Sequence, residues 1–324
     1  MPIPTICDAP PGTVKAQLDR LSSELRASIP PRRLDENLLI ATWNIRAFGD
    51  LTPKWESSDD DSPKRDLGSV LCLAEIISRF DVVAIQEVKD NLKGLRDMMR
   101  VLGGDWGLIM TDTNEGGVGN SERMAFVFDT RRVKPSGLAG ELVVPPEWRD
   151  TIGRDLTSGQ FARTPYAVSF ISHGQTFVLV TLHVLYGDEA SERAGELRAI
   201  AEWMARWAKQ EEDWGHNLIA LGDFNIDRID DPNFEAFTST GLRPPMELEG
   251  LPRTIFDQAG ENFYDQIAWF TTEGTVPVLS LRYTGNAGNF DFTPSLQGDL
   301  TLTSLSWRIS DHYPLWAEFW VTGE

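Results

Sequence analysis

The chain has 324 residues, of which 41% are apolar and 24% charged, and a formal net charge of −19 at pH 7. This balance is typical of a globular protein that is long enough to bury a large core. No apolar run approaches the roughly 20 residues that a membrane-spanning helix needs. The negative charge argues against general nucleic-acid binding, because neutralised phosphates supply most of the non-specific affinity. A nuclease whose positive charge is local, or comes from bound cations, stays compatible with it.

The N-terminus and the two cysteines predict where the protein works. Residues 1–11 include Asp8 and lack a basic start followed by an apolar stretch, so this segment is not expected to be a secretory signal. Cys72 lies among apolar residues, which indicates a buried free thiol rather than a disulfide with Cys7. We expect a cytoplasmic protein, and no motif indicates a protein partner.

Hydrophobic patterning predicts the elements in chain order. An amphipathic helix comes first, over residues 12–28, since Val14, Leu18, Leu21 and Leu25 recur at helical spacing. Further helices are expected near 64–79, 90–101 and 188–210. Short apolar runs predict strands near 38–43, 81–86, 106–110, 123–128, 165–171, 176–183, 217–222, 265–270 and 313–320. The mixture favours an N-terminal helical extension over residues 1–37 and one layered α/β domain over 38–324, with two packed sheets and outer helices.

Several of these apolar runs stop at a residue that can bind a metal or move a proton. Four of them end at Asn44, Glu87, His183 and Asp223, and the last strand is preceded by Asp311 and His312. Polar residues at strand ends lie at the rim of a sheet, where ligands usually bind in α/β folds. Because all of these residues are Asn, Glu, Asp or His, the pattern predicts one shared site and a metal-dependent hydrolase.

Glu87 and Asn44 are the leading candidates for a metal site. A carboxylate at the end of a buried strand is costly unless it is paired or binds a metal. Hard divalent ions such as Mg²⁺ take oxygen ligands, and Asn44 supplies an amide oxygen from a neighbouring strand. The alternative for Glu87 is an ordinary salt bridge at the strand end.

Asp223 and Asn225 form the sharpest local motif. Residues two apart in an extended chain share a face, so these two side chains point together while Phe224 anchors the opposite side. Such a pair can hold an attacking water and orient a phosphate oxygen. The alternative is an Asx turn that follows a strand.

Two of the four histidines are candidates for acid–base chemistry. His183 ends a strand and His312 precedes one, whereas His173 and His216 lie in turn-like sequence and are expected at the surface. A histidine that works on a phosphate usually has an orienting carboxylate, for which Asp265 and Glu122 are candidates. Spacing alone leaves the pairing open.

Three further segments have both a functional and a structural interpretation. Arg163, just before a strand, could clamp a phosphate or make a surface ion pair. The glycines of 116–119 lack the Lys-Ser/Thr ending of a P-loop and predict a flexible turn. The acidic run 59–61 is flanked by Ser and Pro, which predicts a solvated loop rather than a metal site.

The ordered set of motifs resembles the endonuclease/exonuclease/phosphatase superfamily, and its deoxyribonuclease I branch most closely. The likeness runs from about residue 38 to 321 and rests on Trp43-Asn44-Ile45-Arg46, Ile85-Gln86-Glu87-Val88, Glu122-Arg123, Arg163-Thr164-Pro165, Leu182-His183, Gly222-Asp223-Phe224-Asn225, Tyr264-Asp265-Gln266-Ile267 and Ser310-Asp311-His312-Tyr313-Pro314.

This resemblance implies a four-layer α/β sandwich and assigns roles to the candidate residues. Asn44 and Glu87 would hold Mg²⁺ or Mn²⁺, with Asp311 close by. Glu122 would pair with His183 and Asp265 with His312, and the two histidines would flank the scissile phosphate as general base and general acid. Asp223 and Asn225 would position the water and the phosphate. Arg163 would hold the substrate backbone. Separately from the resemblance, we expect Arg46 and Lys89 to neighbour Arg163 in a local basic patch if DNA is the substrate.

The chain also departs from that branch in ways that bear on the substrate. It lacks the cysteines of the branch's disulfides, has Asn120 where the branch has an aromatic residue that stacks in the minor groove, and carries an insertion over residues 50–66. We expect a divalent-metal phosphodiesterase that cuts DNA, with RNA as a further nucleic-acid substrate. The alternative is an enzyme of the same fold that acts on a phospholipid or an inositol phosphate.

Overall fold

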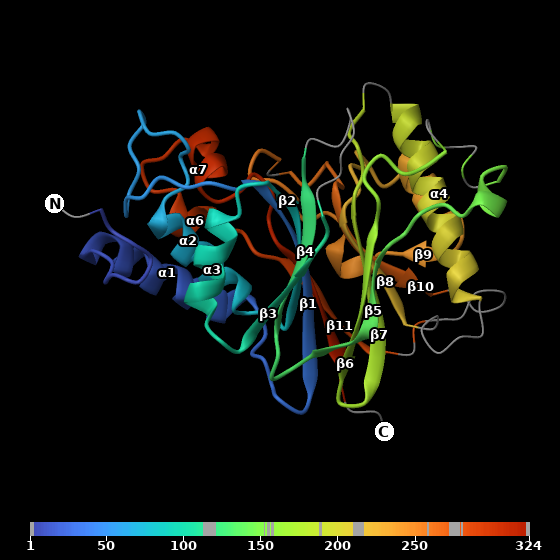
Figure 1. The fold of residues 1–324 in the computed structure, drawn as a ribbon, viewed down its shortest axis with the longest axis horizontal. Coiled ribbons are helices and arrows are strands. Elements are labelled where there is room, and N and C mark those ends of the chain that lie inside the picture. The colour runs from blue at the N-terminus through green and yellow to red at the C-terminus, as the bar shows by residue number, and fades with distance from the viewer. Residues whose placement is uncertain are drawn as a thin grey trace.

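Two six-stranded sheets lie face to face, and helices cover the outer side of each (Figure 1). The computed structural model describes residues 3–112, 121–151, 153, 156, 159–187, 190–209, 217–257, 259–271, 279 and 281–321. Three apolar clusters account for the layering: one lies between the two sheets, and one lies under the helices on each side. The predicted four-layer α/β sandwich is confirmed.

Both sheets are mixed. The first contains, in spatial order, β11 (Tyr283–Asn289), β12 (Leu315–Trp320), β1 (Asn37–Phe48), β2 (Val82–Val88), β4 (Arg123–Asp129) and β3 (Trp106–Met110). The second contains β5 (Lys134–Glu141), β6 (Tyr166–Ser172), β7 (Gln175–His183), β8 (Leu218–Asp223), β10 (Asp265–Phe270) and β9 (Leu242–Arg243). The pairs β1–β2 and β7–β8 are parallel, and the other pairs are antiparallel.

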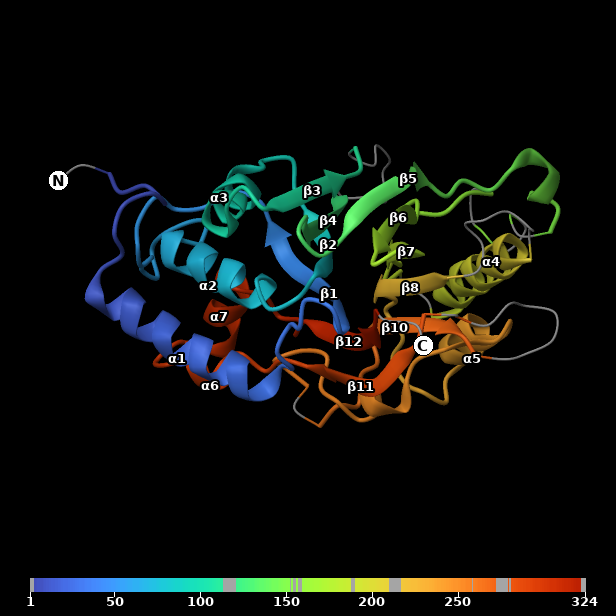
Figure 2. The same ribbon diagram turned by 90° about the horizontal axis from the view of Figure 1, so that it is seen from below.

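The helices form the two outer layers. The first sheet is covered by α1 (Gly12–Ser28), α2 (Leu67–Ile77), α3 (Lys93–Leu102), α6 (Thr293–Leu296) and α7 (Leu302–Arg308). On the second sheet lie α4 (Ala190–Ala208) and α5 (Pro232–Thr238), which Figure 2 shows side by side. Short 3-10 turns occupy Pro146–Trp148 and Met246–Leu248. None of the helices in the described part of the chain has the length and apolar character that crossing a membrane requires.

Most predicted elements are present, and the differences have local causes. Every expected helix and strand is found, with α1, β3 and β10 at their predicted bounds. The short helices α5, α6 and α7 were missed, and so were three strands: β5, β9 and β11. All three lie at sheet edges, where one side of the strand has no neighbour, and β5 and β11 contain glycines that weaken the strand pattern. The helix α1 packs against α2, and Leu21 and Leu25 belong to the cluster that includes β1.

The prediction that the first two strands end before Asn44 and Glu87 is wrong. Strand β1 continues to Phe48 and β2 to Val88, where the two strands pair again after a shift of register. Ala47 and Glu87 sit in this irregular stretch with left-handed backbone angles, φ +44° and φ +61°. The two candidate ligands therefore lie on strands that twist and change register, a common arrangement near active sites.

The cysteines and the acidic run match their predictions. Cys72 is a buried free thiol on α2, and burial raises the pKa of this thiol; Cys7 is free and exposed. The run 59–61 lies in a loop, in which Asp61 pairs with Lys54 at 2.6 Å.

Gly222 sets how closely β7 and β8 approach each other at their ends. Its φ is +144°, and a Cβ atom there would lie 2.0 Å from the carbonyl oxygen of Leu182 on the neighbouring strand. The register pairs Leu182 with Gly222 and His183 with Asp223. Only a residue without a side chain allows this contact, which brings His183 beside Asp223.

We expect Gly222→Ala to destabilise the protein by roughly 2–3 kcal/mol, because the new methyl group meets backbone rather than a side chain that could move away. Urea unfolding followed by circular dichroism measures the effect. Gly140→Ala is the matched control, since a Cβ atom there has nothing within 4 Å. An equally stable Gly222→Ala protein would show that the strands can separate at this point without loss.

Candidate active site

Two histidines from distant parts of the chain converge on one carboxylate. His183 ends β7, Asp223 ends β8, and His312 precedes β12. The Nε2 atom of each histidine lies 3.9 Å from Oδ2 of Asp223. All three side chains are largely buried, so this convergence is fixed by the packing of the two sheets.

The Nδ1 atom of each imidazole lies next to a second carboxylate. Nδ1 of His183 lies 3.1 Å from Oε2 of Glu122, and Nδ1 of His312 is hydrogen-bonded to Oδ2 of Asp265 at 2.6 Å. Both pairings implied by the family resemblance are therefore present. In each case the carboxylate fixes the ring orientation, so that the other nitrogen faces Asp223.

Glu122 is held by three basic side chains. Besides His183, it contacts Nζ of Lys89 at 2.7 Å and Nε of Arg163 at 3.3 Å. Burial alone would raise the pKa of Glu122, but His183, Arg163 and Lys89 together lower it to about 2. Glu122 is therefore ionised at neutral pH, and its charge is shared by its neighbours.

The surroundings of His312 are acidic instead. Burial would lower the pKa of this imidazole, yet Asp265, Asp223 and Asp311 raise it well above its usual value. The two histidines therefore differ in their charge environment. The carboxylate beside His183, Glu122, also pairs with Lys89 and Arg163. His312 instead has three carboxylates around it.

The motif at the end of β8 forms the Asx turn that was the alternative considered from sequence, and Asn225 is not in the extended conformation expected of it. The backbone N–H of Asn225 donates to Oδ1 of Asp223 at 3.0 Å, which is an Asx-type turn, and Asn225 has φ +50°. Meanwhile Oδ2 of Asp223 faces the histidines. The Asn225 amide donates to the carbonyl of Val184 at 2.6 Å, so the turn is tied to the end of β7. The turn thus holds the carboxylate in its place.

Asn44 offers an oxygen that suits a divalent cation. Its Nδ2 donates to Oδ2 of Asp223 at 3.0 Å, while its Oδ1 is buried and has no hydrogen-bond partner among the described residues. Buried polar atoms are normally satisfied, so this oxygen calls for a ligand. Glu87 lies on the adjacent parallel strand β2, directly after Gln86, the residue that pairs with Asn44. One of its oxygens accepts from the N–H of Ala47 at 2.8 Å.

Asp311, the third predicted metal ligand, lies beside Arg46. Its Oδ2 is 3.5 Å from Nη1 of that arginine, which also donates to Ser306 at 2.8 Å and stacks 3.9 Å above the ring of Trp307. Amide and carboxylate oxygens of this kind are the ligands that Mg²⁺ and Mn²⁺ favour, so the residues fit the implied ion.

A different trio, Asp223, Asp265 and His312, has ligand atoms within 4.8 Å of one another in the described part of the chain. The hydrogen bond between His312 and Asp265 accounts for this proximity without a metal.

Arg163 does not make the surface ion pair considered as its alternative. It is only 6% exposed, contacts Glu122 and donates to the carbonyl of His183 at 3.4 Å. The remaining histidines are divided: His173 is exposed as predicted, whereas His216 lies outside the described residues. Asn120 and the glycines of 116–119 lie outside them as well.

Three buried side chains that sequence reasoning missed hold the site together. Arg253 donates to the carbonyl of Asp265 at 2.9 Å, and Arg65 of the insertion donates to the carbonyls of Arg46 and Ala47 at 2.7 and 2.9 Å. The hydroxyl of Ser310 donates to the carbonyl of Asn44 at 2.6 Å and accepts from two backbone N–H groups. Apart from the bond between Ser310 and the N–H of His312, these contacts join residues at least 12 positions apart, for which a sequence has no local pattern. The only signal was the placement of Ser310 beside Asp311.

Fold and site together define a class of hydrolase, and comparison with known proteins names the family. Residues 41–318 match the Endonuclease/Exonuclease/phosphatase family. The chain therefore belongs to this family, whose members include phosphodiesterases and nucleases.

Similar proteins include two deoxyribonucleases. A "Deoxyribonuclease" of Thioalkalivibrio sp. (strain K90mix) is 26% identical over 297 residues, which cover 87% of this chain and 71% of that protein. "Deoxyribonuclease-1" of Bos taurus is 25% identical, with 91% and 97% covered. Among solved structures, an endonuclease/exonuclease/phosphatase family protein from Bacteroides thetaiotaomicron superposes with a TM-score of 0.56 at 18% identity, covering 89% of this chain and 99% of that one. The last likeness concerns the fold alone.

We expect Ser310→Ala to lower the free energy of unfolding by about 1–3 kcal/mol, because the backbone N–H groups of Arg46 and His312 lose a buried acceptor. Thermal and urea unfolding measure the change. Ser239→Ala is the control, since the exposed hydroxyl of Ser239 makes only a local bond to Ala236. Unchanged stability of Ser310→Ala would mean that water replaces the hydroxyl at no cost.

Proposed function

We propose that this chain is a divalent-metal-dependent phosphodiesterase, and that it is an endonuclease that hydrolyses DNA. The observation that carries the proposal is the pair of carboxylate-supported imidazoles, each 3.9 Å from the same oxygen of Asp223. Two acid–base groups beside one buried carboxylate suit an in-line displacement at phosphorus, where one proton leaves the attacking water and another reaches the leaving oxygen. The similarity to two deoxyribonucleases supports DNA as the substrate.

In this proposal Asp223 and Asn225 position the water and the phosphate. His183 and His312 serve as general base and general acid, with Glu122 and Asp265 as their orienting partners. The bond from the water oxygen to phosphorus forms as the bond to the 3′-oxygen breaks, which leaves a 5′-phosphate and a 3′-hydroxyl. Asn44, Glu87 and Asp311 would hold Mg²⁺ or Mn²⁺, which when bound would neutralise the charge that develops on the phosphate oxygens.

Arg163 and Arg46 would contact the substrate backbone. Because Arg163 is paired with the buried Glu122, its role would be to fix Glu122 and to offer its remaining N–H groups to a phosphate. Arg46 is half-buried between Asp311 and Trp307 and would meet the strand on the other side of the site. The free thiols support the cytoplasmic location expected from the sequence.

We expect activity to require a divalent cation and Glu87→Ala to lose at least roughly 100-fold in rate, since a bound ion contributes several kcal/mol to phosphoryl transfer. Plasmid nicking with Mg²⁺, Mn²⁺ or EDTA measures the rate, and a thermal shift on adding Mn²⁺ reports binding directly. The exposed Glu36, replaced by Ala, is the control. Full activity in EDTA would overturn the metal assignment.

Replacing either His183 or His312 by Ala is expected to cost at least roughly 100-fold in rate, the usual scale for losing an acid–base group. If the two act as a unit, the double variant loses less than the product of the single losses. The exposed His173, replaced by Ala, serves as the matched control. Near-normal turnover by either single variant would leave that histidine with a structural role only.

A second function has its own support: hydrolysis of a phospholipid or an inositol phosphate. The net charge is −19, and the acidic insertion exposes Asp59 and Asp60 next to Lys64 and Lys89 in one surface hollow. Incubation with plasmid, single-stranded DNA, RNA, sphingomyelin and inositol phosphates separates the two functions. Nicking that falls steeply with monovalent salt, and that weakens in Arg163→Ala, supports DNA. Cleavage of a small phosphoester without any nicking supports the alternative.

A further inference from the structure

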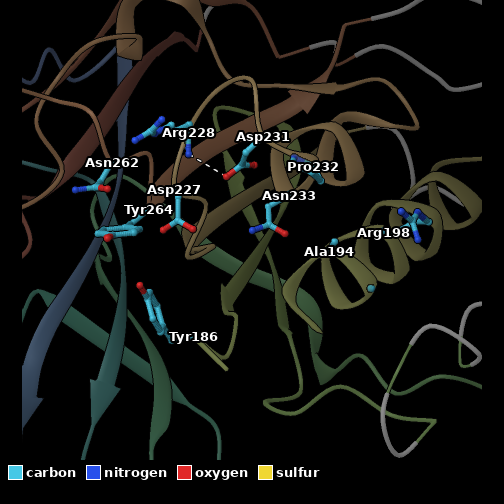
Figure 3. A pocket seen from close by; sticks show the side chains of 11 residues that line it. Tyr186, Ala194, Arg198, Asp227, Arg228, Asp231, Pro232, Asn233, Asn262 and Tyr264 are labelled. Carbon is cyan, nitrogen blue, oxygen red and sulfur yellow. Dashed lines mark hydrogen bonds between the residues drawn. The ribbon is translucent and has the colours of Figure 1, made fainter. Parts of the chain in front are cut away.

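Each side of the candidate active site opens into a hollow. On the side of the second sheet, a recess lies between α4 and Tyr264, the residue before Asp265 (Figure 3). On the side of the first sheet, a hollow of about 550 Å³ is lined by the insertion over residues 50–66, by the ends of β1 and β2 and by Trp307 of α7. Figure 1 shows the insertion, in light blue, beside α7. The proposed reaction gives this insertion no role.

Buried arginines tie the insertion to α7 and to β1. Arg65 is 2% exposed and donates to the carbonyls of Arg46 on β1 and Arg308 on α7, at 2.7 and 3.1 Å. Arg308 donates in turn to the carbonyl of Ser57 in the insertion at 2.8 Å. Hydrogen bonds of charged groups are among the strong ones, and leaving a buried one unmade is costly. The helix α7 is therefore held at a fixed place beside Arg46.

Two neighbouring side chains of α7 hold the guanidinium of Arg46. The guanidinium carbon lies 3.9 Å from the centroid of the Trp307 ring, and Nη1 donates to the hydroxyl of Ser306 at 2.8 Å. Tryptophan attracts a cation over its face more strongly than the other aromatic residues, and the contact grows stronger as water is removed. Arg46 is partly shielded, with 27% of its side chain exposed. The ring therefore helps to fix the plane of the guanidinium.

The guanidinium keeps part of its binding capacity for a ligand. Its hydrogen bond to Ser306 and its ion pair with Asp311, at 3.5 Å, both use Nη1. No described residue accepts a hydrogen bond from Nε or Nη2 of Arg46. A fork of two such nitrogens matches two oxygens of one phosphate. Without the ring, the guanidinium could turn and close on Asp311, and the fork would then point away from a substrate.

The exposure of Trp307 and the charge around it argue for a role in binding. Tryptophan is highly buried on average, yet this indole is 42% exposed. The hollow that it lines has mixed charge, since Lys64 is accompanied there by Asp59 and Asp60. Net positive charge therefore does not hold a phosphate at this place, and the affinity depends on how well Arg46 is oriented.

We propose that Trp307 is a positioning residue, whose ring holds the Arg46 guanidinium with Nε and Nη2 toward a phosphate of the substrate backbone. The inference rests on the proposed nuclease function and deepens it by adding a residue that acts through Arg46 and not on the reacting atoms. The insertion supports this contact, because Arg65 joins both α7 and β1. A guanidinium that is already oriented loses less freedom on binding, so the contact strengthens the affinity for the strand.

The test compares cleavage of one end-labelled DNA, in the form that the wild type cuts, by the wild type, Arg46→Ala and three Trp307 variants. We expect Trp307→Ala to raise KM about fivefold with kcat within about twofold of the wild type, because a backbone contact away from the reacting bond is made equally in the ground state and the transition state. Trp307→Leu keeps apolar bulk without a π face and is expected to match Trp307→Ala. Trp307→Phe keeps such a face and is expected to lie near the wild type.

A double variant, Arg46→Ala with Trp307→Ala, separates positioning from direct contact. In the Arg46→Ala background, the loss of the ring is expected to raise KM no further, since the ring then has no guanidinium to hold. Trp148→Ala is the matched control, because it also removes an indole beside an arginine. Trp148 lies 5.0 Å from the guanidinium of Arg206 and packs against Trp203 of α4, in the outer layer of the second sheet. This control is expected to leave KM unchanged.

The contrary results are distinct from one another. Multiplicative losses in the double variant would mean that the ring contacts the substrate directly, and a wild-type KM for Trp307→Ala or Trp307→Leu would mean that the ring only fills space. Either result overturns the positioning role while the nuclease function stands. A wild type that cuts no nucleic acid contradicts the proposed function instead, and the positioning role falls with it, since Arg46 then has no backbone phosphate to hold.

Discussion

The site depends on one buried carboxylate, Asp223, which is held where three strand ends meet. The Asn44 amide donates to Oδ2 of this residue, and both imidazoles face the same atom. A buried charge of this kind is costly unless donors surround it. Packing of the two sheets brings Asn44 on β1 and the residues at the ends of β7 and β8 together, so the sandwich itself supplies the donors.

Polar contacts across the sheet interface keep that geometry in place. Below the site, Gln86 of β2 donates to the hydroxyl of Thr181 on β7 at 2.9 Å and to that of Thr42 on β1 at 3.1 Å. Hydrogen bonds inside an otherwise apolar layer fix the register of one sheet against the other. The candidate acid–base groups, which come from both sheets, are thereby fixed relative to one another.

Charge is balanced locally although the whole chain is strongly acidic. Lys89 and Arg163 both form ion pairs with Glu122, and Arg46 forms an ion pair with Asp311. Each of these three cations of the described residues is thus paired with a carboxylate.

The sequence by itself determined the layered α/β class and the order of the principal strands. It also singled out His183, His312, Asp223 and Asn44, which the structure brings together. It could do so because buried strands and amphipathic helices leave periodic patterns, and because polar residues next to them are few. Only the tertiary structure decided the extension of β1 and β2 past Asn44 and Glu87, the edge strands β5, β9 and β11, and the buried position of Arg163. It also decided the structural roles of Arg65, Arg253 and Ser310. These features depend on contacts between residues that are far apart in the chain. Such contacts leave no periodic pattern in the sequence from which they could be predicted.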